Sequence, residues 1–108
     1  MLLRISTRAD WAEARESGAI PLDLEGFVHC ADPGTVHLPA NSLYRNRSGL
    51  VLLVVDPEGL PVLYEPGDGD ESGPWFPHVY GPIPADSVVA VLDFEPDPDG
   101  VFRPPPVL

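Results

Sequence analysis

Short apolar runs with the spacing of β-strands recur along the chain. Residues 1–6 alternate between two faces, as do residues 26–31, where Phe27, His29 and Ala31 share one face. The run from Leu50 to Asp56 has six consecutive apolar residues and ends in Asp-Pro, which is typical of a central strand buried on both faces. Further strands are predicted over 62–65 and 88–94.

Two segments have helical signals. Thr7 has the form of an N-cap for a helix over 8–17 that Gly18 ends, and Trp11 on this helix is expected to anchor in the core. Asp32-Pro33 has the form of a second helix start, with the helix running to about Tyr44. Pro39 must kink this second helix or postpone its start.

The segments between these elements are rich in proline and glycine. Residues 66–74 contain Gly-Asp-Gly-Asp and are predicted to form a mobile loop, while 75–84 are predicted to form a stiff aromatic loop. Residues 96–108 are expected to be a tail, extended on the surface or disordered. The order of elements predicts one mixed α+β domain over 1–95, with two helices and a mostly antiparallel sheet.

Composition narrows the class of protein. The chain has 108 residues, 44% of them apolar, so a core is feasible. No apolar run approaches the roughly 18 residues of a membrane helix, and charged residues interrupt the N-terminus where a secretory signal would lie. The single cysteine, Cys30, excludes an internal disulfide. These features favour a cytoplasmic protein without a membrane segment.

The charge is strongly negative and uneven. Six arginines and 17 acidic residues give −11, and there is no lysine, which excludes a P-loop and a Schiff-base lysine. Residues 1–54 hold five of the arginines and residues 55–108 hold eleven of the acids. The net negative charge argues against a nucleic-acid partner. The distribution of the arginines places any anion-binding surface in the first half of the chain.

His29, Glu65 and His78 are the candidate catalytic residues. His78 lies among aromatic residues and prolines, a setting typical of small-molecule pockets, and Glu65 ends a strand beside a loop, where it could act as a general base. The structural alternatives are a hydrogen-bonded core histidine for His29, a packed loop residue for His78 and an ordinary exposed carboxylate for Glu65.

The sequence predicts no metal site, because the three histidines lack metal-ligand spacing. Cys30 cannot be activated by His29, since adjacent strand residues point to opposite faces. It is expected to be a small buried hydrophobe.

Four segments occur together in an order that resembles a bacterial family, domain of unknown function 952. They are Gly26-Phe27-Val28-His29-Cys30, the run Leu50–Asp56, Tyr64-Glu65-Pro66, and Phe76-Pro77-His78-Val79-Tyr80-Gly81-Pro82. The resemblance covers about residues 2–95 and implies an ADP-ribosylation-like fold, in which NAD binds in a cleft between two small sheets. It implies that His29 holds a ribose, that Glu65 corresponds to the glutamate at the nicotinamide ribose, and that Tyr80 or Tyr44 is the aromatic residue near the nicotinamide.

The leading hypothesis is therefore an enzyme of ADP-ribosyltransferase type that binds an NAD-like nucleotide. Its cleft would include Phe76 and Tyr80 beside the catalytic candidates, and Arg4 or Arg45 would neutralise a pyrophosphate. The alternative is a non-catalytic module that binds a small ligand or a protein, because a chain of charge −11 repels NAD. RNA processing is disfavoured by the few basic residues, and the chain could be a monomer or a homodimer.

Overall fold

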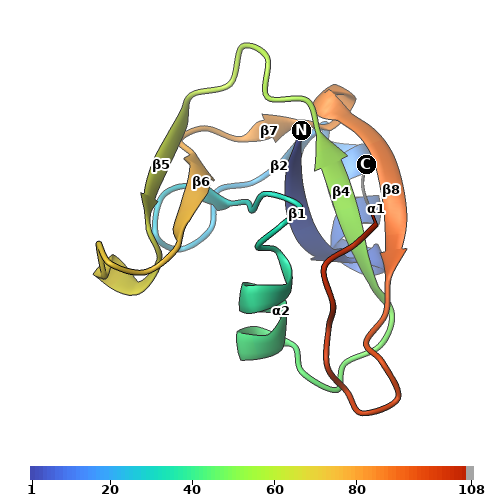
Figure 1. Ribbon diagram of the computed structural model, residues 1–108. Coiled ribbons are helices and arrows are strands. Elements are labelled where there is room, and N and C mark those ends of the chain that lie inside the picture. Colours follow the sequence, from blue (N-terminus) through green and yellow to red (C-terminus); the bar gives the residue numbers. More distant parts are fainter. Residues whose placement is uncertain (107–108) are drawn as a thin grey trace.

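Two helices and three antiparallel sheets make up the computed structural model, which describes residues 1–106 (Figure 1). This arrangement confirms the predicted mixed α+β class with two helices and antiparallel pairing. Neither helix within these residues has the length and apolar character needed to cross a membrane.

The first sheet has the order β1-β4-β8 and comprises β1 (Leu2–Thr7), β4 (Leu50–Val55) and β8 (Val88–Phe94). All six side chains of β4 are at most 5% exposed. The prediction of a central strand buried on both faces is therefore confirmed.

Each face of this sheet contributes to a separate core. On one side, β4 packs with α1 (Arg8–Ser17) and with the other two sheets, and we call this the first core. On the other side it packs with α2 (His37–Leu43) and with Phe94 and Phe102, and we call this the second core. Trp11 is only partly buried, against the edge of the first core.

The second three-stranded sheet has the order β3-β6-β5, with β3 (Val28–His29), β6 (Trp75–Val79) and β5 (Val62–Pro66). Residues 75–79 are thus a central strand, and the prediction of a stiff loop there is wrong. Pro77 is tolerated in this strand because its carbonyl still accepts a hydrogen bond from the Cys30 amide, while its ring is buried. A two-stranded sheet of β2 (Ala19–Ile20) and β7 (Ile83–Pro84) completes the set.

The helix boundaries follow local capping. The Thr7 side chain accepts a hydrogen bond from the Asp10 amide, and Gly18 closes α1 with φ +99°, as predicted. The second helix begins later than its Asp-Pro signal, because residues 32–36 form turns and Pro39 lies within the first turn of α2, where its missing N–H does no harm. The Asp32 carboxylate accepts a hydrogen bond from Tyr64 instead of capping the helix.

Part of the predicted tail belongs to the second core. Phe102 is 1% exposed, and its ring lies 4.8 Å from that of Phe94. Its backbone N–H and C=O both bind the side chain of Asn41 on α2. Gly100 lies so close to Asn46 that a Cβ would overlap the Asn46 side chain. Residues 107 and 108 of the predicted tail lie outside the described residues.

We predict that Phe102→Ala lowers the free energy of unfolding by about 3–5 kcal/mol, the range for removing a buried phenylalanine. Urea unfolding followed by circular dichroism measures it. Arg103→Ala is the neighbouring control and should change the free energy by less than about 1 kcal/mol, because its ion pairs are exposed. Equal effects of the two substitutions would contradict the packing of this segment.

Candidate functional site

A cavity with a volume of about 820 Å³ lies between α2, β1, β3 and the end of the β5–β6 hairpin, and we call it the larger cavity. This size is within the usual range of about 300–1,000 Å³ for small-molecule sites. Polar side chains and aromatic rings from all four parts line it, among them Arg4, Asp23, Phe27, His29, Tyr44, Phe76 and His78. Gly67 in the hairpin also lines it, and a Cβ there would lie 2.8 Å from the Phe76 ring.

A cluster of rings lies on the face of the second sheet that points away from the first core. Phe27 stacks on His78 with ring centroids 4.0 Å apart, and it lies 4.6 Å from the ring of His29 and 5.3 Å from that of Tyr80. The two imidazoles are 5.5 Å apart, edge to face, because His29 and His78 are directly paired across β3 and β6. We call Phe27, His29, Glu65, His78 and Tyr80 the imidazole cluster.

Asp23 holds His29. Its Oδ2 lies 2.7 Å from His29 Nδ1 and also accepts the His29 backbone N–H at 2.9 Å. Arg4 binds the same carboxylate through both terminal nitrogens, at 2.8 and 2.9 Å. Burial favours a raised pKa for Asp23, but the hydrogen bonds from Arg4 and His29 outweigh it and the pKa lies below its ordinary value.

Glu65 holds His78. Its Oε1 lies 2.8 Å from His78 Nδ1 and accepts a short hydrogen bond of 2.5 Å from the Tyr80 hydroxyl. The hydrogen bonds from Tyr80 and then His78 lower the pKa of Glu65, and the bond to Glu65 raises the pKa of Tyr80. His78 is 8% exposed beneath Phe27, so its orientation is fixed by packing as well as by the carboxylate.

The two carboxylates set the tautomers of the two rings. An ionised carboxylate only accepts hydrogen bonds, so each Nδ1 must carry its proton and each neutral ring keeps its lone pair on Nε2. Within residues 1–106, neither Nε2 forms a hydrogen bond to the protein. Both Nε2 atoms are therefore available to bind a ligand or to take and give a proton.

The structure brings most of the sequence candidates together. Five of them line the larger cavity, namely His29, His78, Arg4, Tyr44 and Phe76. Glu65 and Tyr80 belong to the imidazole cluster, because Glu65 binds both His78 and Tyr80, but they do not line the cavity. Arg45 is exposed and lines neither cavity, so it does not join the other candidates.

Other expectations at the site also have outcomes. His29 is exposed, so the alternative of a core histidine does not apply to it, whereas Cys30 is buried and burial raises the pKa of its thiol to about 12. Ala31 leaves the expected face of Phe27 and His29, because it bridges to Leu3 and enters the second core. Within residues 1–106, no group of three or more His, Cys, Asp or Glu side chains could hold a metal ion.

Sequence reasoning missed Asp23 and Arg47. Asp23 begins a turn that Gly26 closes with φ +93°, and the Asp-x-x-Gly spacing of this turn is a signal that could have placed the carboxylate beside His29. The guanidinium of Arg47 lies 5.5 Å from the ring centre of Tyr44 and thus near the larger cavity. No local pattern separates Arg47 from its neighbour Arg45.

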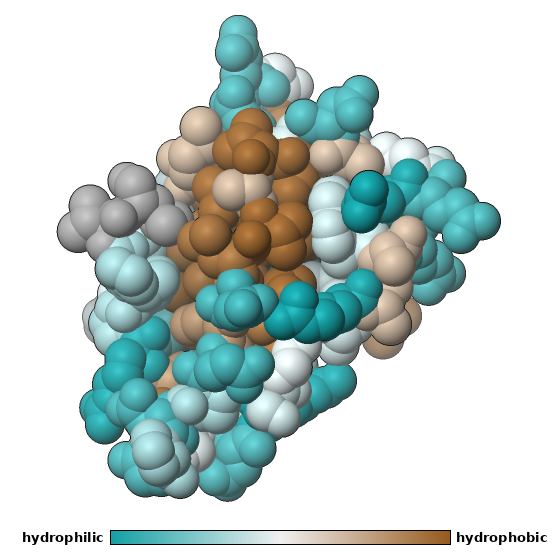
Figure 2. All heavy atoms as spheres, turned by 90° about the vertical axis from the view of Figure 1, so that its right-hand side faces the viewer, coloured by the Kyte–Doolittle hydropathy of each residue, from teal (hydrophilic) through white to brown (hydrophobic). Residues whose placement is uncertain are grey.

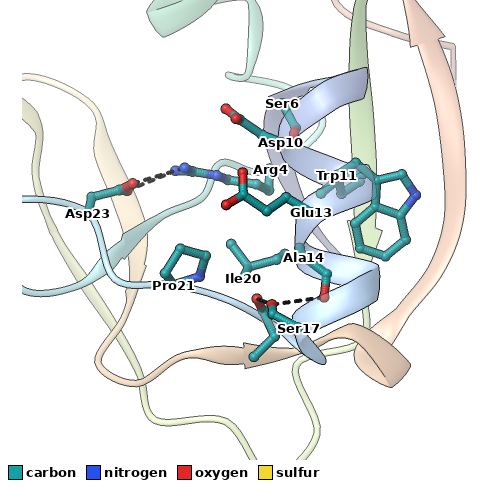
Figure 3. A pocket seen from close by; sticks show the side chains of 12 residues that line it. Arg4, Ser6, Asp10, Trp11, Glu13, Ala14, Ser17, Ile20, Pro21 and Asp23 are labelled. Carbon is teal, nitrogen blue, oxygen red and sulfur yellow. Dashed lines mark hydrogen bonds and ion pairs between the residues drawn. The ribbon is translucent and has the colours of Figure 1, made fainter.

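The smaller cavity, of about 450 Å³, shares Arg4 and Asp23 with the larger one. Figure 3 shows the ion pair between these two residues, with Asp10 and Glu13 of α1 extending toward Arg4 and the Trp11 ring lying beyond the helix. The ion pair is therefore part of the wall between the two cavities. Within this wall, Asp23 neutralises the charge of Arg4.

The chain belongs to the family described as "Protein of unknown function (DUF952)", whose model matches residues 5–91. It is similar to the crystal structure of protein CC0527 from Caulobacter crescentus, with 29% identity, a TM-score of 0.80, and coverage of 94% of this chain and 92% of that one. The solution NMR structure of CC0527 gives 30% identity, a TM-score of 0.79 and coverage of 94% and 90%. No curated protein matches the chain.

We predict that Asp23→Asn lowers the free energy of unfolding at pH 7 by about 1.5–3 kcal/mol, the range for hydrogen bonds to a charged group. The folded pKa of Asp23 lies below 3.8, so its contribution is present above that pH and is lost as the pH falls through the folded value. The difference between wild type and variant should therefore shrink in acid. Urea unfolding from pH 7 to pH 3 tests this, with the same change at the exposed Asp86, Asp86→Asn, as the matched control. A difference that stays constant with pH would contradict the assignment.

We predict that neutral His29 and His78 carry their proton on Nδ1, the opposite of the tautomer usual in water. Ring-nitrogen chemical shifts in NMR spectra report the tautomer directly. Glu65→Ala should release His78 to the Nε2–H form and leave His29 unchanged, because Asp23 still holds that ring. A wild-type protein with Nε2–H on both rings would show that the carboxylates do not hold them.

Proposed function

We propose that the larger cavity binds a nucleotide of NAD type and that the chain is an enzyme of ADP-ribosyltransferase type with an ADP-ribosylation-like fold. One observation carries this proposal: two carboxylate-held imidazoles meet beside Phe27 and Phe76 at a cavity large enough for such a ligand. Proteins recognise planar bases by stacking on aromatic rings, and ribose hydroxyls by imidazole and carboxylate groups.

His29 and His78 have separate roles in this proposal. His29 Nε2 binds a ribose hydroxyl, with Asp23 fixing the ring. Transfer of an ADP-ribosyl group breaks the bond between the ribose carbon and nicotinamide, and the electron pair leaves with nicotinamide. The acceptor atom bonds to that carbon, and His78 Nε2 takes the proton that the acceptor loses.

Glu65 is a positioning residue in this proposal. The resemblance to the family implied that Glu65 corresponds to the glutamate at the nicotinamide ribose. However, its Oε1 accepts from both His78 and Tyr80, and it does not line the cavity. Its role is therefore to hold the His78 ring and to favour the positive charge that His78 gains as it accepts a proton.

Arg47 is the candidate partner for a pyrophosphate. Arg4 is bound through both nitrogens to Asp23, and Arg45 lies away from the cavity. Arg47 forms no ion pair within residues 1–106 and lies over Tyr44, which lines the cavity. A guanidinium at this rim offers two donors to phosphate oxygens.

The alternative is a non-catalytic module that binds an uncharged or cationic small ligand. The acidic residues Asp23, Glu25 and Asp68 line the cavity, whose one guanidinium is already neutralised. Exposed leucines also line it, namely Leu24, Leu38 and Leu43. These features favour an apolar ligand without phosphate groups.

Calorimetric titration separates the two functions. Wild type should bind NAD and ADP-ribose, and His29→Ala should weaken both about tenfold or more, since a hydrogen bond to a charged or polarised group contributes about 1.5–3 kcal/mol. Arg47→Ala should weaken NAD and ADP-ribose but leave nicotinamide riboside, which lacks the pyrophosphate, unchanged. His37→Ala is the histidine control, because His37 lines neither cavity.

The outcomes are distinct. Binding of nicotinamide riboside alone would favour the non-catalytic module. No binding of any of the three compounds at millimolar concentration would end the nucleotide proposal. Spectra of each variant must first show that it keeps the wild-type fold, because His29→Ala also removes a partner of Asp23.

A further inference from the structure

Strand β8 has a free edge. It pairs with β4 along one side, and on its other side no strand of residues 1–106 pairs with it. In an antiparallel sheet, alternate residues of such a strand direct their N–H and C=O groups outward. The seven residues of β8 therefore present a row of backbone donors and acceptors that a further strand could bind.

The side chains at this edge are apolar. Residues 88–92 read Val-Val-Ala-Val-Leu, and Val89 and Val91 are 56% and 41% exposed. Figure 2 shows a continuous hydrophobic patch on the side of the molecule where β8 faces the viewer, bordered by polar residues. An apolar patch around an unpaired strand edge is typical of a surface that another polypeptide covers.

Edge strands are usually protected from pairing with another chain by lysine, proline or a β-bulge, and most of β8 lacks these features. The chain has no lysine, and β8 contains no proline. The register shift opposite Val54 and Val55 distorts only the N-terminal end, so residues 90–94 pair regularly with β4. The one charged side chain in β8, Asp93, is neutralised by Arg8 at 2.6 Å. By contrast, the other sheet's edge strand β5 ends in Glu65 and Pro66.

We propose that a second copy of this chain covers the β8 edge, so that the two β8 strands pair antiparallel in a homodimer. An antiparallel strand offers its own copy the complementary row of donors and acceptors, and a two-fold axis near the central residue, Val91, uses the same surface of both copies. The two sheets then form one six-stranded sheet in the order β1-β4-β8-β8-β4-β1.

Packing and charge are both compatible with self-pairing. Val91 is in register with Leu53 of the first core, so two Val91 side chains meeting at the axis extend that apolar layer from one copy to the other. Each chain carries −11, but the one acid within β8, Asp93, is paired with Arg8, and Glu95, which follows the strand, accepts a hydrogen bond from the Gly49 amide. The acidic hairpin end at 68–71 lies on the opposite side of the molecule (Figure 1).

Sedimentation equilibrium of the full chain tests the proposal. Wild type should have twice the chain mass of 11.7 kDa, and Val91→Lys should weaken association at least tenfold, because it brings two cations together at the axis. Leu63→Lys is the matched control: it makes the same kind of change at a 53% exposed residue of the other sheet's edge strand and should leave the dimer intact.

Amide hydrogen exchange locates the interface. Outward-facing amides of β8 should exchange more slowly as the wild-type concentration rises, and this concentration dependence should vanish in Val91→Lys. Because position 91 is exposed, the variant should keep the wild-type spectrum, and Val89→Lys gives a second test. A wild type that is monomeric throughout, or a dimer that Leu63→Lys rather than Val91→Lys dissociates, would overturn the proposal. Nucleotide titration does not involve this edge, so the two proposals can fail separately.

Discussion

The burial of β4 on both faces is the constraint on which the rest of this structure depends. Its six apolar residues remove so much surface from water that each face of the first sheet must be covered. On one face, α1 and the second sheet provide the cover; on the other, α2 and Phe102 provide it. The second sheet therefore has only one face on the core, and its other face is free to hold the imidazole cluster.

Asp23 links this packing to the chemistry of the site. It binds Arg4 from β1, and the backbone and ring of His29 from β3, so one carboxylate both joins two sheets and fixes a candidate ligand-binding ring. Because Arg4 is neutralised by Asp23, the lining of the cavity keeps little attraction for anions, and for this reason the proposed function assigns the pyrophosphate to Arg47, which lies over Tyr44.

The sequence predicts the features that depend on local patterns. The buried run of β4, the caps of α1 and the burial of Cys30 follow from spacing and capping residues close in the chain. The direct pairing of His29 with His78 was not predicted, because it requires residues 75–79 to form a strand where the sequence indicated a loop. Pro77 in a central strand and Phe102 in the second core depend on partners 47 and 61 residues away, which no local pattern contains: the amide of Cys30 and the side chain of Asn41.

The cavity and the free edge of β8 are separate surfaces of one sheet system. No residue of β8 lines the larger cavity, and in Figure 1 the second sheet and β8 lie on opposite sides of β1 and β4. Pairing through β8 would thus leave the cavities of both copies open. Since β4 lies between these surfaces and its side chains are closely packed, pairing would also hold the sheet that positions Arg4, without any direct contact with the imidazole cluster.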